Sequence, residues 1–169
     1  MATAALNHLW PRDGVPTGNG NPVQNVGVGA VVGVGFNKQQ TSGICWLWRV
    51  PTQAALATGL TFSLIVADDP NNADPGKVVR FSIIIGPVAT GTLVDEATAL
   101  ASSNETGGSV TMNATSGKNT IASIAVVNAD MNSLAVGNWA LIRLRRLGTN
   151  SADTHRGRAV LLNATVYDT

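Results

Sequence analysis

The chain has 169 residues and a formal net charge of +1, and 12% of its residues are charged while 44% are hydrophobic. This length suits a single domain with its own core and leaves little room for two. The near-zero net charge excludes a strong field toward nucleic acid or acidic membranes. Charged residues are about half as frequent as the roughly 25% of ordinary soluble domains, so we expect contacts with other subunits to cover part of the surface.

Residues 1–22 predict an extended N-terminal arm rather than a folded element. They contain three prolines and three glycines, and proline fixes φ and removes a hydrogen-bond donor. We expect Leu9 and Trp10 to anchor this arm, and we expect the arm to become ordered when it binds a partner. The start of the chain lacks the basic stretch and apolar core of a signal peptide. No segment has the ~18 apolar residues of a membrane helix.

From residue 23 onward, alternation of apolar and polar residues predicts strands, because successive side chains of a strand point to opposite faces. The expected strands cover residues 23–36, 44–50, 60–67, 78–85, 109–114, 119–127, 138–147 and 158–167. Turn-rich segments such as 68–77 and 149–153 separate them, and only 95–103 has the composition of a helical turn. About eight strands joined by unequal loops predict one antiparallel jelly-roll β-sandwich over residues 23–169.

The same alternation assigns inward faces to the strands. Two strands are expected to bury every second side chain, namely Leu60, Phe62, Leu64 and Val66 in one and Val79, Phe81, Ile83 and Ile85 in the other. Trp46 and Trp48 share a face, which we assign to the core or to a subunit interface, with an aromatic sugar platform as the alternative. Cys45 is the only cysteine, so no intrachain disulfide can form, and we expect its side chain to be buried.

Two further patterns resemble ligand sites but fit strands and turns better. The glycines from Gly27 to Gly35 alternate with other residues, mostly valine, and no helix follows, which excludes a dinucleotide site. Oxygen-bearing side chains gather in residues 68–74, where calcium is a candidate ligand. Pro70 and Pro75 interrupt an EF-hand pattern, and no glutamate follows at the required spacing. We therefore expect no metal and no cofactor.

The segment between the last two expected strands carries an acid, a histidine and two arginines, which are Asp153, His155, Arg156 and Arg158. Adjacent residues point in different directions, and neither a convergent triad nor a GxSxG elbow accompanies them. We interpret the segment as a structural turn to which Asp153, Arg156 and Arg158 belong. Asp153 is expected to pair with Arg143, Arg145 or Arg158 and so to fix the register of the flanking strands.

The strand at 138–147 has two different faces. Its inward residues are expected to be Ala140, Ile142 and Leu144, whereas the opposite face carries Trp139, Leu141, Arg143 and Arg145. Tryptophan and arginine together are typical of a subunit interface or partner face. Single-stranded nucleic acid is an alternative ligand for such a face, but the near-zero net charge argues against it.

The C-terminal half of the chain resembles a known family. It contains GNWALIRLRR at 137–146 and, after a short loop, ADTHRGRAVLLNATVY at 152–167. A strand ending in arginines, an Ala-Asp-Thr turn, a glycine and a last strand ending in tyrosine resemble small structural proteins of tailed bacteriophages. The upstream stretch VVRFSIIIGPVATGTLVDEA at 78–97 fits the same family. The resemblance spans roughly residues 55–169, and the glycine–valine segment at 23–36 departs from it.

This resemblance implies a capsid decoration or cement protein on the outer surface of the phage head. Such proteins resemble jelly-roll homotrimers that bridge subunits of the major capsid protein, without enzymatic activity and without a membrane or nucleic-acid partner. The arm is expected to lie over the capsid through Leu9, Trp10, Pro11, Arg12 and Val15. We therefore expect the protein in the virion.

Two other functions compete with this expectation. A trimeric tail, fibre or head-fibre module that binds host-surface glycans is the first alternative, and it predicts exposed aromatic side chains near loop acids and amides. A hydrolase on a β scaffold is the second, and it requires acidic residues that converge. The ten acidic residues are scattered over predicted turns, which favours a non-catalytic protein.

Overall fold

The computed structural model of the chain describes residues 5–17, 24–38, 42–89, 91, 100 and 104–169. These residues form eleven strands and two short 3-10 turns, η1 (Pro11–Asp13) and η2 (Asn128–Met131). The strands are β1 (Ala5–Leu9), β2 (Val15–Thr17), β3 (Gln24–Val28), β4 (Val31–Phe36), β5 (Gly43–Arg49), β6 (Leu60–Asp68), β7 (Val78–Val88), β8 (Thr106–Thr111), β9 (Asn119–Val126), β10 (Trp139–Arg146) and β11 (Ala159–Asp168). The segment 95–103, where a helical turn was expected, lies outside the described residues apart from Leu100.

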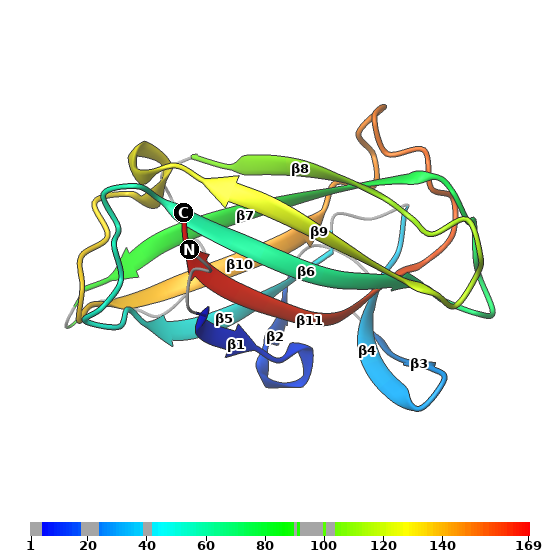
Figure 1. Ribbon diagram of the computed structural model, residues 1–169, viewed down its shortest axis with the longest axis horizontal. Coiled ribbons are helices and arrows are strands. Elements are labelled where there is room, and N and C mark those ends of the chain that lie inside the picture. Colours follow the sequence, from blue (N-terminus) through cyan, green and yellow to red (C-terminus); the bar gives the residue numbers. More distant parts are fainter. Residues whose placement is uncertain (1–4, 18–23, 39–41, 90, 92–99, 101–103) are drawn as a thin grey trace.

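Strands β4 to β11 form a jelly roll. Their pairing is nested, with β4 beside β11, β5 beside β10, β6 beside β9 and β7 beside β8, all antiparallel. This folding of a long hairpin over itself creates two facing sheets, which we name sheet A (β3-β4-β11-β6-β9, with β1 also on β11) and sheet B (β2-β5-β10-β7-β8). Figure 1 shows sheet A in front of sheet B. The predicted all-β jelly-roll sandwich is therefore confirmed.

The N-terminal arm belongs to this sandwich. β1 pairs with β11 in sheet A, and β2 pairs with β5 in sheet B, so the segment between them crosses from one sheet to the other. Leu9 is 4% exposed within the main core. The indole Nε1 of Trp46 donates a hydrogen bond to the carbonyl oxygen of Trp10 at 2.9 Å. The prediction of an arm ordered only by a partner is corrected for these residues, because this chain supplies their partners.

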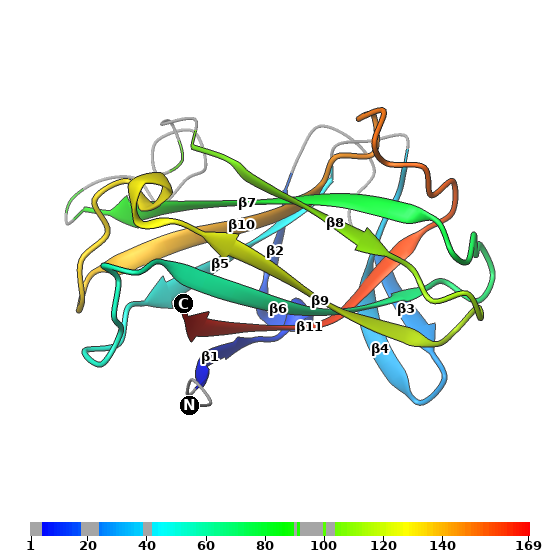
Figure 2. The same ribbon diagram turned by 45° about the horizontal axis from the view of Figure 1, so that its top comes forward.

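The glycine–valine segment at 23–36 forms a hairpin instead of one strand. β3 and β4 pair up to Val28 and Val31, so the chain reverses at Gly29 and Ala30. Gly29 has a φ of +59°, a backbone conformation that favours glycine in two-residue turns. The backbones of β4 and β11 approach closely here, because a Cβ on Gly33 would lie 2.5 Å from the carbonyl oxygen of Leu161. The hairpin projects from one side of the sandwich (Figure 2).

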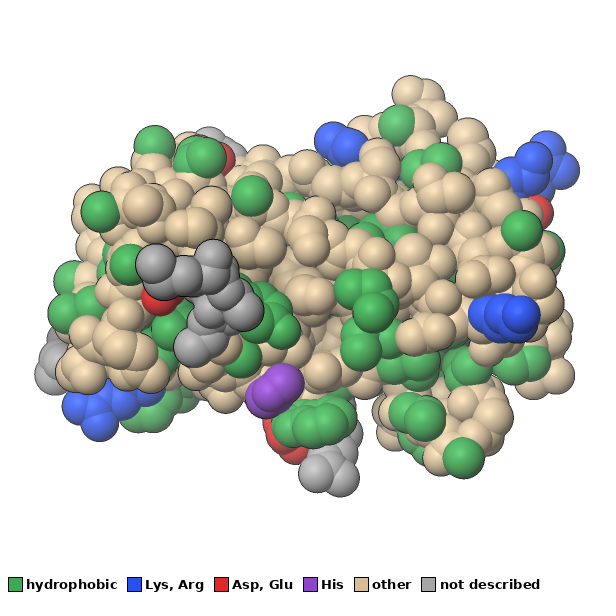
Figure 3. All heavy atoms as spheres, viewed as in Figure 1, with side chains coloured by type: hydrophobic (Ala, Val, Ile, Leu, Met, Phe, Trp, Pro, Cys, Tyr) green, Lys and Arg blue, Asp and Glu red, His purple; other side chains and the backbone are tan. Residues whose placement is uncertain are grey.

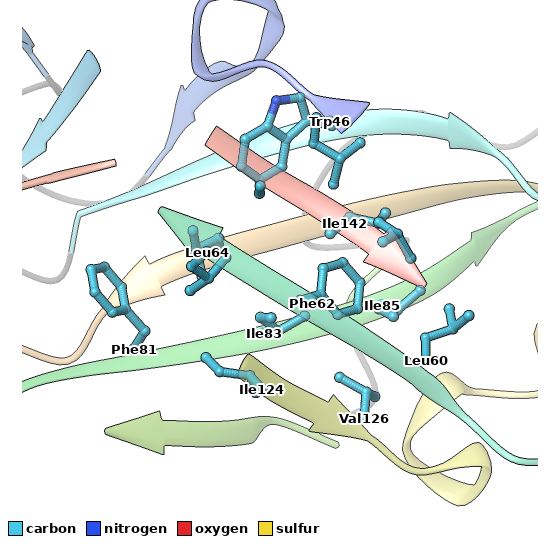
Figure 4. Close-up of a cluster of buried hydrophobic side chains, with 14 of the residues drawn as sticks. Trp46, Leu60, Phe62, Leu64, Phe81, Ile83, Ile85, Ile124, Val126 and Ile142 are labelled. Atoms are coloured by element: carbon cyan, nitrogen blue, oxygen red, sulfur yellow. The ribbon is translucent and has the colours of Figure 1, made fainter. Parts of the chain in front are cut away.

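The inward faces predicted from alternation are confirmed. The four inward residues of β6 and the four of β7 are each 0% to 1% exposed. They pack against Trp46, Ile124 and Ile142 from three other strands (Figure 4). Trp48 is 2% exposed, so both tryptophans of β5 belong to the core. Cys45 is 5% exposed, as expected for a small buried hydrophobic residue.

Among the described residues, no helix has the length and hydrophobicity that crossing a bilayer requires.

Candidate functional site

The charged segment between β10 and β11 is a buried ion-pair network. Arg146 and Asp153 form two charge-assisted hydrogen bonds, Nε to Oδ2 at 2.8 Å and Nη2 to Oδ1 at 2.9 Å, and both side chains are 0% exposed. The other three N–H groups of Arg146 are donated to the carbonyl oxygens of Phe36, His155 and Gly157. All five guanidinium donors therefore have acceptors, which is what a buried arginine requires.

The predicted partner of Asp153 was wrong. Asp153 pairs with Arg146 rather than with Arg143, Arg145 or Arg158. Arg146 continues the inward series Ala140, Ile142 and Leu144 on β10, so its burial was readable from the alternation. Arg158 pairs with Asp69 at 3.0 Å. The Arg156 backbone N–H is donated to Asp74, while its side chain is exposed.

His155 takes part in the same network and is 0% exposed. Its Nε2 forms a hydrogen bond with the Asp68 carboxylate, and its Nδ1 faces Nη2 of Arg146 at 3.5 Å. A histidine enclosed in this way has no path to a substrate, so the acid–histidine pair of this segment is not a catalytic site.

The acidic turn at residues 68–74 serves the fold in the same way. Asp69 accepts hydrogen bonds from the Asn71 backbone and from Arg158, and Asp74 accepts one from the Arg156 backbone. Among the described residues, no group of three or more His, Cys, Asp or Glu side chains is arranged to hold a metal ion. These carboxylates hold the turn against the segment that leads into β11.

The predicted partner face of β10 lies on the outer side of sheet B and is partly covered. Trp139 is 48% exposed, whereas Leu141 is 6% exposed because Cys45, Ile84 and Leu100 pack around it. Arg143 and Arg145 are half-buried. Leu141 is therefore unavailable to a partner. The exposed apolar side chains on this side are Val15, Leu47 and Trp139, on the three neighbouring strands β2, β5 and β10.

An ion pair crosses the same face. Arg145 donates to both carboxylate oxygens of Glu105, which also accepts a hydrogen bond from Ser82. Partial burial of Glu105 opposes its ionisation, but these hydrogen bonds and the positive charges of Arg145 and Arg143 outweigh that effect. The pKa of Glu105 consequently lies below its ordinary value of 4.5.

The outer face of sheet A carries no charged side chain on the three neighbouring strands β11, β6 and β9. The outward residues of β6, β9 and β11 are Thr61, Ser63, Ile65, Ala67, Asn119, Ile121, Ser123, Ala125, Val160, Asn163, Thr165 and Tyr167. Of these, Ala67, Val160 and Thr165 are buried, the first two by packing with Val26 and Val28 of β3. Figure 3 shows this side of the molecule, where blue and red side chains are absent over the middle of β6 and β11. Charged residues are scarce in the composition, and this sheet face is one place where they are absent. The sequence alone did not predict which face that would be.

The predicted capsid-contact arm divides into buried and exposed residues. Leu9 and Pro11 are buried within this chain, whereas Trp10 is 48% and Val15 is 66% exposed. The side chain of Arg12 lies outside what the structure describes. Only Trp10 and Val15, among the described side chains of this set, are available to a partner.

Trp10 also stands at a groove of about 410 Å³ between η1 and the β3–β4 hairpin. The lining residues are Trp10, Pro11, Asn25, Ala30, Val31, Val32, Gly33, Val34 and Leu162, none of which is charged. The Trp10 ring stacks on His8, with centroids 6.3 Å apart and an interplanar angle of 28°. The groove therefore offers one aromatic ring and one side-chain amide to an uncharged ligand.

Comparison with known proteins gives structural similarity only. No known family matches the chain, and no curated protein does. The native structure of a family 35 carbohydrate binding module from Clostridium thermocellum matches with a TM-score of 0.51 and 13% identity, over 96% of this chain and 99% of that chain. The family 35 module from Cellvibrio japonicus Abf62 matches with a TM-score of 0.48 and 14% identity, over 99% and 89%. At such low identity, the similarity to the Clostridium thermocellum module shows a shared β-sandwich fold and nothing further. The relation to phage proteins rests on the sequence resemblance alone.

Proposed function

We propose that the chain is a non-catalytic virion protein that binds the outer surface of a phage head and bridges subunits of the major capsid protein. The observation that carries this proposal is the charge-free outer face of sheet A. Soluble surfaces ordinarily mix charges of both signs, and depletion of charge is typical of the centre of a protein interface. The capsid as partner comes from the resemblance of the C-terminal half.

Such a protein stabilises the shell by burying surface in several contacts at once. Contacts of ~800 Å² on each partner suffice for one specific interface. A homotrimer that engages several capsid subunits gains avidity, because later contacts become intramolecular once the first has formed. The exposed apolar residues Val15, Leu47 and Trp139 on sheet B supply a second surface, which we assign to contacts between copies of the chain.

The first test is the copy number and location of the protein in purified phage particles. Hundreds of copies over the head support the proposal, whereas a few copies at the tail overturn it. The second test uses Ile121→Lys, which places a charge on the sheet A face, where Ile121 is 66% exposed. We expect binding to capsids that lack the protein to weaken about tenfold or more.

Val136→Lys is the matched control, because Val136 is a 47% exposed aliphatic residue between η2 and β10, outside both proposed contact surfaces. Assayed at a concentration where the trimer stays assembled, it is expected to bind capsids like the unmodified chain. Equal binding by the Ile121 variant and the unmodified chain would show that sheet A does not face the shell.

Binding of a host-surface glycan by a tail or fibre module is the second candidate function. The groove beside Trp10 and Asn25 supports it, and the structural neighbours are carbohydrate binding modules by name. A glycan array with the unmodified chain and two variants separates the proposals. Trp10→Ala is expected to abolish glycan binding if this function holds, and Trp139→Ala, which removes an equally exposed indole elsewhere, is expected to retain it.

A further inference from the structure

A cavity of about 740 Å³ that is wide open to solvent lies at the end of the sandwich, beside the buried Arg146–Asp153 pair. Its lining residues are Lys38, Gly148, Thr149, Asn150, Ser151, Asp153 and Arg156. They come from the end of β4 and from the loop between β10 and β11, which stands out at one end of the molecule in Figure 2. Neither the proposed capsid contact nor the proposed glycan groove uses this cavity.

The charges of the lining favour an anion. Asp153 supplies the only carboxylate among these residues, and both of its oxygens are taken, by Arg146 and by the backbone N–H of Arg80. The Lys38 ammonium donates one of its three N–H groups to the carbonyl oxygen of Asp153 at 2.7 Å, and its other two have no hydrogen-bond partner among the described residues. The Arg156 guanidinium has no hydrogen-bond partner among the described residues.

The neutral side chains of the lining add further donors. The side-chain hydroxyl groups of Thr149 and Ser151 have no hydrogen-bond partner among the described residues. The carboxamide oxygen of Asn150 accepts the backbone N–H of Ala152 at 2.9 Å, which leaves its NH₂ group for a ligand. Two cations, two hydroxyl groups and an amide thus line the same cavity.

The backbone that carries these groups is fixed without a ligand. A Cβ on Gly148 would lie 1.9 Å from the carbonyl oxygen of Lys38, so the two segments touch at a position that only glycine allows. Successive backbone hydrogen bonds from Asn150 to Leu147 and from Asp153 to Asn150 form the loop into two tight turns. A fixed backbone limits the ordering cost of binding to that of the side chains.

We propose that this cavity binds a phosphate group. A tetrahedral oxyanion accepts several hydrogen bonds at once, and arginine and lysine are the side chains that proteins use to hold it. The cavity has room for more than the anion, since ligand pockets of small molecules measure roughly 300–1,000 Å³. The hydroxyl and amide groups suit a polyhydroxylated remainder, so a phosphorylated sugar and free phosphate share the chemistry of this site.

The experiment is isothermal titration calorimetry of the full chain with glucose 6-phosphate, inorganic phosphate, glucose and acetate at constant ionic strength. We expect both phosphates to bind and glucose and acetate to show no binding. If glucose 6-phosphate binds more tightly than inorganic phosphate, the ligand is a phosphorylated sugar. If the two affinities are equal, the ligand is free phosphate. Binding of glucose as tight as that of its phosphate overturns the proposal, as does the absence of binding by both phosphates.

The variants Lys38→Gln and Arg156→Gln are each expected to weaken phosphate binding roughly tenfold. Arg156 is exposed and its side chain holds no described partner, so its variant is expected to fold normally. Lys118→Gln is the control, because it removes an exposed lysine in the turn between β8 and β9. If the Lys118 variant loses as much affinity as the Arg156 variant, the binding is a non-specific charge effect and the site is refuted.

Discussion

Arg146 and Asp153 join the two sheets at one end of the sandwich through a bidentate ion pair from which water is excluded, with N–O distances of 2.8 Å and 2.9 Å. Arg146 ends β10 in sheet B and reaches the carbonyl oxygen of Phe36 at the end of β4 in sheet A. Asp153 also accepts the backbone N–H of Arg80 on β7. One pair of side chains therefore holds three strands that are far apart in the sequence.

We predict that Arg146→Met lowers the free energy of unfolding by about 3–5 kcal/mol, because it leaves the Asp153 carboxylate buried without its partner. Urea denaturation measures this change. Arg145→Met is the control, since its pair with Glu105 is partly exposed and is expected to contribute about 1 kcal/mol or less. Adding Asp153→Leu to the Arg146 variant is expected to restore part of the loss. Equal losses in the two single variants would contradict a special role for the buried pair.

Gly33 and Gly27 make a matched test of close backbone packing. Gly33→Ala is expected to cost about 1–3 kcal/mol, because its Cβ would press on the carbonyl oxygen of Leu161 at 2.5 Å. Gly27→Ala meets nothing within 4 Å, and it is expected to be neutral or to stabilise by up to about 1 kcal/mol. Thermal unfolding of both variants measures the difference. A smaller loss at Gly33 than at Gly27 would show that β4 does not pack on β11 as described.

The attachment of the N-terminal segment can be measured through the two buried tryptophans of β5. Trp46→Phe removes the hydrogen bond to the carbonyl oxygen of Trp10, whereas the Nε1 of Trp48 has no hydrogen-bond partner among the described residues. Both variants lose similar volume, so we expect Trp46→Phe to cost about 1 kcal/mol more than Trp48→Phe. Hydrogen exchange of residues 5–17 is expected to accelerate only in the Trp46 variant. Unchanged exchange there would show that the segment is held by its strand pairing alone.

Glu105 is expected to make stability depend on pH. Its pKa in the folded chain lies below the ordinary value of 4.5, so the stability that it contributes is present above pH 4.5 and is lost as pH falls through the lower folded pKa. Urea denaturation of the unmodified chain and of Glu105→Gln, from pH 7 to pH 3, measures this contribution. The two chains are expected to differ at neutral pH and to converge in acid. If the difference in the free energy of unfolding between the two chains grew as the pH fell, the predicted direction of the pH dependence would be wrong.

The sequence alone determined the fold class and the inward faces. Alternating residues such as Leu60, Phe62 and Leu64 have a period of two, and only a strand with one face in a core satisfies that period. The same rule, continued along β10 for one more step, assigns Arg146 to the core. Local chemistry of this kind acts over a few residues, so it can be read without knowing the tertiary structure.

Only the tertiary structure decided which side chains and segments meet. Asp153 had three candidate partners on the flanking strands, and the pairing of β10 with β7 and the closure of the sandwich brought it to Arg146 instead. Lys38 meets Gly148 across 110 residues of sequence for the same reason, and the donor-lined cavity exists only where those segments touch. Long-range contacts depend on strand order and register, which the alternation of residues within one strand does not specify.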